Sequence, residues 1–338
     1  MSLTSHDVAR LAGLSQSTVS RALRGDPRVA PSTRERVLAA AASLGYTPNA
    51  LGRMLVEGAT RTIGMVVTDI SNPFYPNLIA PLHDELAELG YRMTLFTERL
   101  EGDGADAVSR LEWLVDRGVD GVVLTTSTLE GTVPRELVRR GLPFVFLIRV
   151  VDDIPADSVS VDNALGASLI AAEVVRFGHR RVGAIFGPAD ASTGRDRERG
   201  FRAALTTAGV PLPDGVIRRG SYTVDTGHAA MRELMALADP PTAVVCFNDL
   251  VAIGALNAAV ALGLQVPRDV SLTGWDDLPM ASWDICRLTT VRQSMNEMAR
   301  AAARLIVERV EGRSGADPRH VRFTPEIVLR ATLGAPRA

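Results

Sequence analysis

The sequence predicts an N-terminal all-α helix-turn-helix domain followed by an α/β core of two doubly wound lobes, each built on a parallel sheet. The first part rests on short amphipathic helices separated by glycines within the first 46 residues. The second rests on near-continuous apolar strands that alternate with amphipathic helices from Thr62 onward, which is typical of parallel sheets covered on both faces. This alternation comes in two sets, which indicates two lobes with ligands at the carboxyl ends of the strands.

Charge is distributed unevenly along the chain. The whole chain has a net charge of −2, but residues 1–60 hold seven arginines against four acidic residues, which makes this end +3 and the remainder −5. A basic head on an acidic body indicates that attraction to phosphates is confined to the N-terminal region. All 37 basic residues are arginine, which we interpret as a genome bias rather than a mechanism.

The sequence also indicates a reducing compartment. Cys246 and Cys286 are too few for a disulfide framework and lack the spacing of metal ligands. The N-terminus is polar, without a basic-then-apolar export signal, and no apolar run reaches transmembrane length. We therefore expect a cytoplasmic protein without a membrane partner.

Three helices are predicted in the head. The first is capped by Thr4 or Ser5 and ends at Gly13, the second begins after Ser15, and the third follows Pro31 and ends at Gly45. Ser32 to Glu35 has the pattern of a capping box for the third helix. A glycine-containing turn between two short helices is the helix-turn-helix signature, although a three-helix bundle without a nucleic acid partner would show the same spacing. The residues with inward-facing helical spacing are Val8, Leu11, Ala12, Val19, Ala22, Leu23, Val37, Leu38, Ala41 and Leu44.

The head resembles the DNA-binding domain of the lactose-repressor (LacI/GalR) family. The likeness is carried by the run from Asp7 to Arg21, by the helix from Ser32 to Tyr46, and by the hinge from Pro48 to Leu55. From Arg61 onward the chain resembles the periplasmic-binding-protein-like core of the same family, so the resemblance covers essentially the whole chain. The domains it implies are a head of 1–46, a hinge helix and linker of 47–60, and a core of 61–338 with a first lobe of about 61–160 plus 292–320 and a second of about 161–291 plus 321–338.

The resemblance implies DNA-contacting residues in the head and hinge. Gln16, Ser17 and Arg21 would read base edges in the major groove, and Leu55 would wedge into the minor groove once the hinge folds on DNA. Gly52 stands where the family usually has alanine, which should weaken a hinge helix by about 1 kcal/mol. The full set expected at the DNA is Ser15, Gln16, Ser17, Thr18, Ser20, Arg21, Tyr46, Asn49 and Leu55.

The core elements follow in order from Thr62. The predicted strands are 63–67, 91–96, 121–124, 144–148, 182–186, 243–247 and 270–274. The predicted helices are about 75–90, two that stop at Gly118 and Gly141, and about 162–176, 195–209 and 250–262.

Candidate effector contacts lie in loops after predicted strands. Phe74 and Tyr75 either line a cleft wall or anchor the next helix in the core. Asn248 and Asp276 suit a polyhydroxy ligand, because an amide both donates and accepts and a carboxylate accepts two hydroxyl hydrogens, although Asn248 could instead cap a helix. The resemblance implies a clamping role for Arg197, with Arg195 bracing its loop. The full expected set, in which Tyr222 and Gln293 are implied by the resemblance alone, is Phe74, Tyr75, Arg197, Tyr222, Asn248, Asp276 and Gln293.

One position departs from the family pattern in this region. Ile148 stands where relatives commonly have Asp, Asn or Gly. If the position touches the ligand, one hydroxyl-binding carboxylate is missing, and the effector is less polar there or is bound in another pose.

The sequence carries little sign of catalysis. It has no phosphate-binding loop, no zinc-protease motif and no nucleophile elbow, and its five histidines are scattered singly. We expect no enzyme activity, no cofactor and no metal. The function that the resemblance implies is a ligand-responsive transcriptional regulator, a repressor that binds a palindromic operator as a homodimer and is released by a small carbohydrate-like effector.

Alternatives to this function remain open at the level of the sequence. Within the regulator class, the alternative is corepressor-dependent DNA binding with a purine or nucleoside effector. Outside that class, a solute-binding protein would share the two lobes, and an α/β enzyme would need a catalytic cluster. No heptad run follows Leu329, so a dimer is expected rather than a coiled-coil tetramer.

Overall fold

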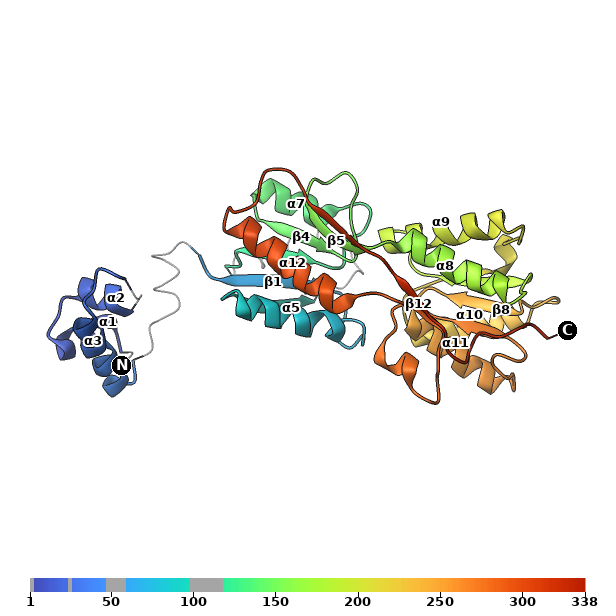
Figure 1. Cartoon of the computed structure of the whole chain (residues 1–338), viewed down its shortest axis with the longest axis horizontal. Helices are drawn as coiled ribbons and strands as arrows, with labels where there is room; N and C mark the ends of the chain where they lie inside the picture. The colour runs from blue at the N-terminus through green and yellow to red at the C-terminus, as the bar shows by residue number, and fades with distance from the viewer. Residues whose placement is uncertain (1–2, 24–25, 47–58, 98–117, 338) are drawn as a thin grey trace. The chain divides into compact units, whose positions relative to one another are not determined.

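The computed structural model describes residues 3–23, 26–46, 59–97 and 118–337 (Figure 1). They fall into two compact units, Met1–Thr60 and Arg61–Ala338. The expected DNA contacts Asn49 and Leu55, together with Gly52, lie outside the described residues, as does most of the helix predicted to stop at Gly118.

The head is a three-helix bundle. Its helices are α1 (Ser5–Ala12), α2 (Gln16–Leu23) and α3 (Pro31–Leu44). Val8, Val19 and Val37, one from each helix, are fully buried where the three helices meet. Gly13 and Gly45 end α1 and α3 in the left-handed conformation, with φ of 62° and 63°, as predicted for helix C-caps.

Three details of the predicted head are wrong. Leu11 and Leu38 were expected inside, but they are 55% and 51% exposed, and the neighbouring Ala9 and Ala40 are buried instead. In such short helices the apolar residues are compatible with more than one inward-facing side. Close packing between the helices favours the side that places small alanines at the contact. The third helix starts at Pro31 with Ala30 as its N-cap, so the predicted capping box at Ser32 is not its start.

The first lobe of the core contains a six-stranded parallel sheet. Its strand order is β11-β5-β4-β3-β1-β2. The strands are β1 (Thr62–Val67), β2 (Arg92–Thr97), β3 (Gly121–Leu124), β4 (Phe144–Leu147), β5 (Asp157–Val161) and β11 (His320–Phe323).

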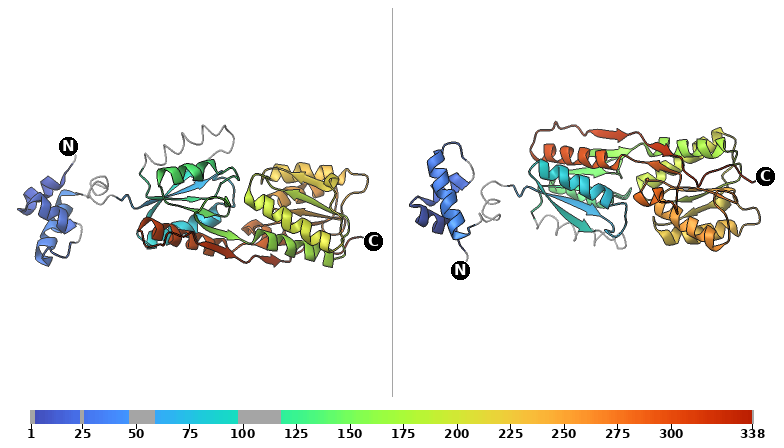
Figure 2. Two further views of the ribbon diagram at one scale, coloured as in Figure 1. Left: turned by 90° about the horizontal axis from the view of Figure 1, so that it is seen from above. Right: turned by 60° about the horizontal axis from the view of Figure 1, so that its bottom comes forward.

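Helices cover both faces of this sheet. α5 (Pro76–Glu88) and α12 (Met295–Val310) pack together on one face, and α7 (Thr132–Arg140) lies on the other (Figure 2). Gly121 permits the close approach of α12, because a Cβ at this position would lie 2.8 Å from side-chain atoms of Ile306 and Val310.

The second lobe repeats this plan with a four-stranded parallel sheet in the order β7-β6-β8-β9. Helices α8 and α9 share one apolar cluster with the sheet, and α10 and α11 share another. The elements are β6 (Val182–Phe186), β7 (Ile217–Arg219), β8 (Ala243–Cys246), β9 (Ser271–Thr273), α8 (Asn163–Arg176), α9 (Ser192–Thr207), α10 (Val224–Met235) and α11 (Asp249–Ala261). Two short 3-10 helices are Asp214–Val216 and Pro279–Ser282. The predicted parallel sheets in two lobes are confirmed.

Within the described residues, the chain passes between the lobes three times. The passages follow β5, precede α12, and lie between β11 and β12 (Glu326–Val328), which pairs antiparallel with β10 (Thr290–Arg292). Because β11 belongs to the first sheet, the last passage comes after Phe323. Three connections that run side by side form a hinge about which two lobes can turn.

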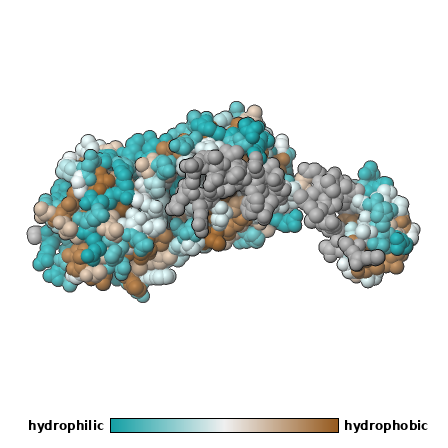
Figure 3. All heavy atoms as spheres, turned by 180° about the vertical axis from the view of Figure 1, so that it is seen from behind, coloured by the Kyte–Doolittle hydropathy of each residue, from teal (hydrophilic) through white to brown (hydrophobic). Residues whose placement is uncertain are grey.

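The core surface is mainly hydrophilic on the face shown in Figure 3, with hydrophobic residues in scattered patches. Most of the large apolar side chains lie instead in the clusters between the sheets and their helices, and Val260, Trp283 and Ile285 are exposed exceptions. Of the helices within the described ranges, none combines the length and the apolarity that crossing a membrane requires.

Candidate functional site

The head exposes the polar face of α2. Gln16, Ser17 and Arg21 are exposed, while Val19 and Ala22 of the same helix are buried against α1 and α3. An exposed polar face that starts at the helix N-terminus can meet base edges and phosphates in a DNA groove.

Hydrogen bonds fix the start of α2. The Thr18 amide donates to Ser15 Oγ at 3.2 Å, so Ser15 is the predicted cap, and Gln16 Nε2 donates to Ser5 Oγ at 3.2 Å. Thr18 and Ser20 are half-buried on α2, and Tyr46 is half-buried against the apolar cluster of the head. The structure therefore brings the described members of the predicted DNA-contacting set to α2 and its surroundings.

A cavity with a volume of about 720 Å³ lies between the lobes of the core. Its lining comes from residues at or just beyond the carboxyl ends of β1, β2, β3 and β4 in the first lobe and of β6, β7, β8 and β9 in the second, where doubly wound folds place their ligands. The lining includes six serine and threonine residues: Thr68, Thr97, Thr125, Thr193, Ser221 and Thr223.

The loop after β1 supplies the aromatic wall of the cavity. Phe74 and Tyr75 both line it, with ring centroids 5.5 Å apart in an edge-to-face arrangement. Tyr75 also belongs to the apolar cluster of the first lobe, and its hydroxyl lies 2.7 Å from Thr68 Oγ1. The two alternatives considered for this loop, cleft wall and core anchor, are therefore both true of Tyr75.

Arg197 extends from α9 into the cavity lining and is 3% exposed. Its Nε donates to Asn163 Oδ1 and its Nη1 to the Phe247 carbonyl, each at 2.8 Å, and its guanidinium carbon lies 4.2 Å from the centroid of the Trp275 ring. Burial lowers the pKa of this guanidinium, which neutral acceptors and an aromatic face hold in one orientation.

Asp276 is 2% exposed and lines the same cavity. It accepts hydrogen bonds from Asn248 Nδ2 at 2.6 Å and from Gln293 Nε2 at 2.5 Å. Burial raises the pKa of Asp276 to about 7, against the opposing effect of the nearby Arg197 charge. The carboxyl group is thus held in place by two amides and can change its charge near neutral pH.

Asn248 performs two tasks at once. Its Oδ1 accepts hydrogen bonds from the Leu250 and Val251 amides at the start of α11, and its Nδ2 holds Asp276. Gln293, in contrast, is absent from the cavity lining and reaches it only through Asp276. Its Nε2 holds the Asp276 carboxylate, and its Oε1 is buried without a hydrogen-bond partner among the described residues.

Tyr222 lines the cavity, and its buried hydroxyl has no hydrogen-bond partner within the described part of the chain. The ring lies against Gly187, where a Cβ would come within 2.2 Å of the hydroxyl oxygen. An unpartnered phenol in a cleft is available to a ligand.

The sequence reasoning missed Arg149, Asp69 and the hydroxyl residues of the lining. The signal that could have found several of them is position, because Thr68, Thr125 and Arg149 follow within two residues of a strand end. Ile148 also lines the cavity and has a φ of 74°, which is rare for a β-branched residue.

Contacts between the lobes close one side of this cleft. Arg195 Nη1 on α9 donates to Asp152 Oδ2 in the first lobe at 2.6 Å, and the Val150 amide donates to Ser192 Oγ at 3.0 Å. Arg195 also contacts Asp196, and these two carboxylates raise its pKa. Arg195 thus links α9 to Asp152 in the first lobe.

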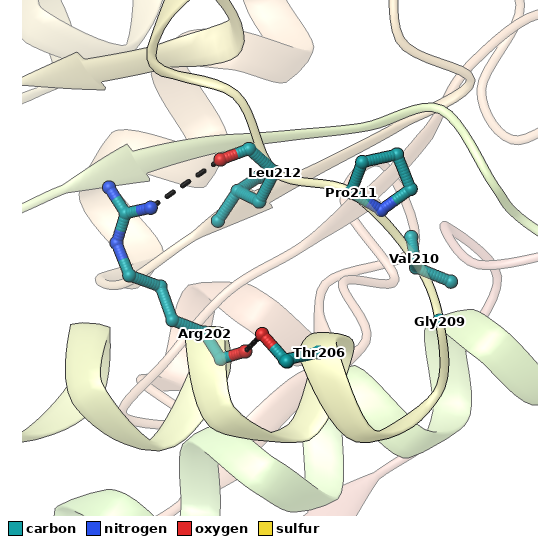
Figure 4. Close-up of a pocket in the computed structure, with 6 residues that line it drawn as sticks. All are labelled: Arg202, Thr206, Gly209, Val210, Pro211 and Leu212. Atoms are coloured by element: carbon teal, nitrogen blue, oxygen red, sulfur yellow. Dashed lines mark hydrogen bonds between the residues drawn. The ribbon is translucent and has the colours of Figure 1, made fainter.

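A second pocket of about 390 Å³ lies at the end of α9 (Figure 4). Arg202 Nη1 donates to the Leu212 carbonyl at 3.4 Å, and its Nε donates to Glu198 at 2.7 Å. Its charged group is already paired locally, so the pocket has the features of a surface hollow. No group of three or more potential metal ligands occurs among the described residues.

Comparisons with known proteins find described families for both parts of the chain. A family described as bacterial regulatory proteins, lacI family, matches residues 4–49, and a periplasmic binding protein-like domain matches residues 171–333. The ribose operon repressor of Escherichia coli is 36% identical over 91% of this chain and 93% of its own length.

Two solved structures are similar along nearly the whole chain. One is the transcriptional regulator CelR in complex with cellobiose, with a TM-score of 0.75 and 32% identity over 98% of this chain and 100% of that one. The other is the lac repressor dimer bound to operator and an anti-inducer, with a TM-score of 0.88 and 25% identity over 99% and 100%.

Proposed function

The chain belongs to the LacI family of bacterial regulatory proteins, and we propose that its cleft binds a small carbohydrate-like effector that controls the affinity of the head for a palindromic operator. It is a ligand-responsive transcriptional regulator with a helix-turn-helix head and a periplasmic-binding-protein-like core. The observation that carries the proposal is the placement of Asp276, held by Asn248 beside Arg197, in a cavity rich in hydroxyl groups.

The chemistry of the cavity supports a polyhydroxy effector. Carboxylate and amide groups fix sugar hydroxyls, and the faces of Phe74 and Tyr222 can pack against the apolar side of a sugar ring. A volume of about 720 Å³ is in the range of small-molecule sites. Cellobiose in the similar CelR structure, and ribose in the name of the similar E. coli repressor, support the same class.

On the DNA side, two heads of a homodimer hold the two halves of the operator. Gln16, Ser17 and Arg21 read bases, while Ser15, Thr18, Ser20 and Tyr46 contact phosphates. Asn49 and Leu55 act from the hinge, with Leu55 at the operator centre. Such a regulator acts on cytoplasmic DNA and is not an enzyme.

Effector binding changes the angle between the lobes and releases the operator, through a coupling of about 1–3 kcal/mol as in typical allosteric proteins. The alternative is a corepressor with a purine or nucleoside in the cleft, which Phe74 and Tyr222 could stack against. The two schemes differ in sign, because an inducer weakens operator binding and a corepressor strengthens it.

The test combines calorimetry with operator binding. Operator sequences are first selected from a random DNA library with the full chain, and sugars and nucleosides are then titrated into the protein with and without that DNA. We expect one sugar class to bind and to weaken the operator complex. A nucleoside that tightens the complex would favour the alternative, and a panel without any effect on DNA binding would contradict the proposal.

A further inference from the structure

We infer that the effector carries an anionic group, a carboxylate or a phosphate, which pairs with Arg149 in the cleft between the lobes. This inference rests on the proposed function of the cleft and specifies the chemical class of its ligand as an acidic sugar.

The Arg149 side chain is buried without a counter-charge. It is 8% exposed and lines the cavity. Within the described residues, no carboxylate lies within 4.0 Å of its guanidinium, and the hydrogen bond found for it, from Nη1 to the Thr126 carbonyl, is 3.4 Å long. That distance exceeds the usual range for such bonds, and a guanidinium has five N–H donors to satisfy. A buried cation without a counter-charge is costly, and an anionic ligand would remove the cost.

The second arginine of the cavity shows the contrast. Arg197 uses its donors on Asn163 and on the Phe247 carbonyl, and its guanidinium covers Trp275. Burial is the main cause that lowers the pKa of Arg197, and the two arginines are close enough that the charge of Arg149 lowers it further. Two neighbouring cations, of which one has no carboxylate partner among the described residues, make this part of the cleft attractive to an anion.

The acidic lining residues do not cancel this charge. Asp69 accepts hydrogen bonds from the amide and hydroxyl of Ser71, in its own loop. Asp276 is held by Asn248 and Gln293, and burial keeps its pKa near 7, so it is partly neutral at physiological pH. Within the described residues, neither acid forms an ion pair or hydrogen bond with Arg149, whose charge remains available.

Backbone strain marks the same place. The Arg149 amide donates to the Leu147 carbonyl at 3.0 Å across Ile148, whose φ is 74°. A hydrogen bond between residues i and i+2 with positive φ at the centre describes a γ-turn of the rare, strained form. The Ile148 amide is in turn held by the Val159 carbonyl of β5 at 2.9 Å. Strained backbone persists where its surroundings enforce it and gathers at ligand sites.

The remaining lining is that of a sugar site, with hydroxyl residues, Asn248 and aromatic rings. A ligand that satisfies both parts combines hydroxyl groups with one anionic group. Uronic acids and sugar phosphates meet this requirement, since the fork of an arginine accommodates either anion with two parallel hydrogen bonds.

The experiment uses matched ligand pairs and the full-length chain. Calorimetry compares glucose with glucuronate and glucose 6-phosphate, galactose with galacturonate, and ribose with ribose 5-phosphate. We expect at least one acidic member to bind about tenfold or more tightly than its neutral parent. Tighter uronates would identify a carboxylate, and tighter phosphate esters would identify a phosphate. Acidic members that bind no more tightly than their parents would overturn the inference.

Variants assign the effect to the side chain. Arg149→Gln should weaken binding of the preferred acidic sugar by about ten- to hundredfold and binding of its neutral parent by less than about threefold. Arg149→Lys should recover part of the loss, because it keeps the charge without the fork. Arg135→Gln is the matched control, since it removes an arginine of the same lobe that is half exposed and paired with Asp153.

A structural role for Arg149 gives a different result. The unliganded Arg149→Gln protein should melt at the same temperature or higher, because no ion pair is lost. A lower melting temperature together with equal losses for acidic and neutral sugars would overturn the inference. If neutral sugars bind best and release the operator, the inference fails but the proposed function stands. If no member of any pair binds or affects the operator, both fail.

Discussion

At the scale of single residues, the sequence could not decide whether position 148 matters for ligand contact or for backbone conformation. Its departure from the Asp, Asn or Gly of relatives suggested a missing ligand contact. The structure shows that the position has a φ of 74°, a conformation that Gly, Asn and Asp adopt more easily than isoleucine. The preference at this position is therefore explained by backbone conformation as well as by ligand chemistry.

Replacing Ile148 by glycine should destabilise the protein less than replacing it by alanine, which is the reverse of the usual order. Both lose the packing of the side chain, but only glycine relieves the left-handed backbone. We expect the glycine variant to be more stable than the alanine variant by about 1 kcal/mol, measured by urea denaturation. At an ordinary extended position glycine would be the less stable of the two, and that order here would argue against strain.

The buried acid at the cleft predicts a dependence on pH. Because burial raises the pKa of Asp276 to about 7, the folded protein keeps this proton between the ordinary carboxyl pKa and about 7, where the unfolded chain has lost it. The folded state then holds more protons, so this group makes stability fall as pH rises through that window.

Effector affinity should follow the opposite trend. The carboxylate accepts hydroxyl hydrogens better than the protonated acid, so affinity for a sugar that does not itself titrate should rise by up to about tenfold from pH 6 to pH 8. Calorimetry across this range measures the change, and Asp276→Asn should remove it. An equally steep profile in that variant would assign the titration to another group.

At the scale of elements, the eight residues of α2 both pack in the helical bundle and present an exposed polar face. Val19 and Ala22 hold it in the head, while the exposed Gln16 and Ser17 are the residues proposed to recognise the operator. Substitution of the exposed pair should therefore alter recognition without unfolding the bundle.

Gln16→Ala and Ser17→Ala should change which operator is preferred and leave nonspecific DNA binding intact. Each lost base contact should cost about 1–3 kcal/mol at the affected position of the operator. Selection from a random DNA library, repeated at two salt concentrations, measures both properties. A uniform loss of affinity for every sequence would instead make these residues backbone contacts.

At the scale of the whole molecule, the charge of the head and the topology of the core serve different functions. The basic head attracts phosphates, and the acidic core places the ends of two parallel sheets around one cavity. Three passages between the lobes and a few polar contacts, including Arg195 with Asp152, are what an effector would have to rearrange.

The contact between Arg195 and Asp152 should show this coupling. Both side chains are partly exposed, so the pair is worth no more than about 1 kcal/mol. In a double-mutant cycle of Arg195→Gln and Asp152→Asn, we expect non-additive changes in effector affinity of up to about fivefold, with a matching change in operator release because linkage is reciprocal. Strictly additive effects would mean that the pair does not report lobe closure.

The sequence alone determined the type and order of most elements. Apolar periodicity and glycine stops are local signals, so the head helices and the parallel strands could be predicted from them. The cavity residues Phe74, Asn248 and Asp276 could be predicted from their positions after predicted strands, whereas Tyr222 was implied only by the family resemblance. The wrong predictions also concerned single positions. Leu11 is exposed because its spacing is compatible with two faces of the helix, and the packing of the bundle determines which face is buried.

Only the tertiary structure decided which of these residues act together. In the structure, Gln293 contacts Asp276 and is not part of the cavity lining. β11 belongs to the first sheet, and the Ile148 amide donates a hydrogen bond to the Val159 carbonyl at the turn of the chain. The tertiary structure also left Arg149 buried without a counter-charge. Burial, pKa and unmet hydrogen bonds arise from neighbours distant in the chain, and no local pattern of residues encodes them.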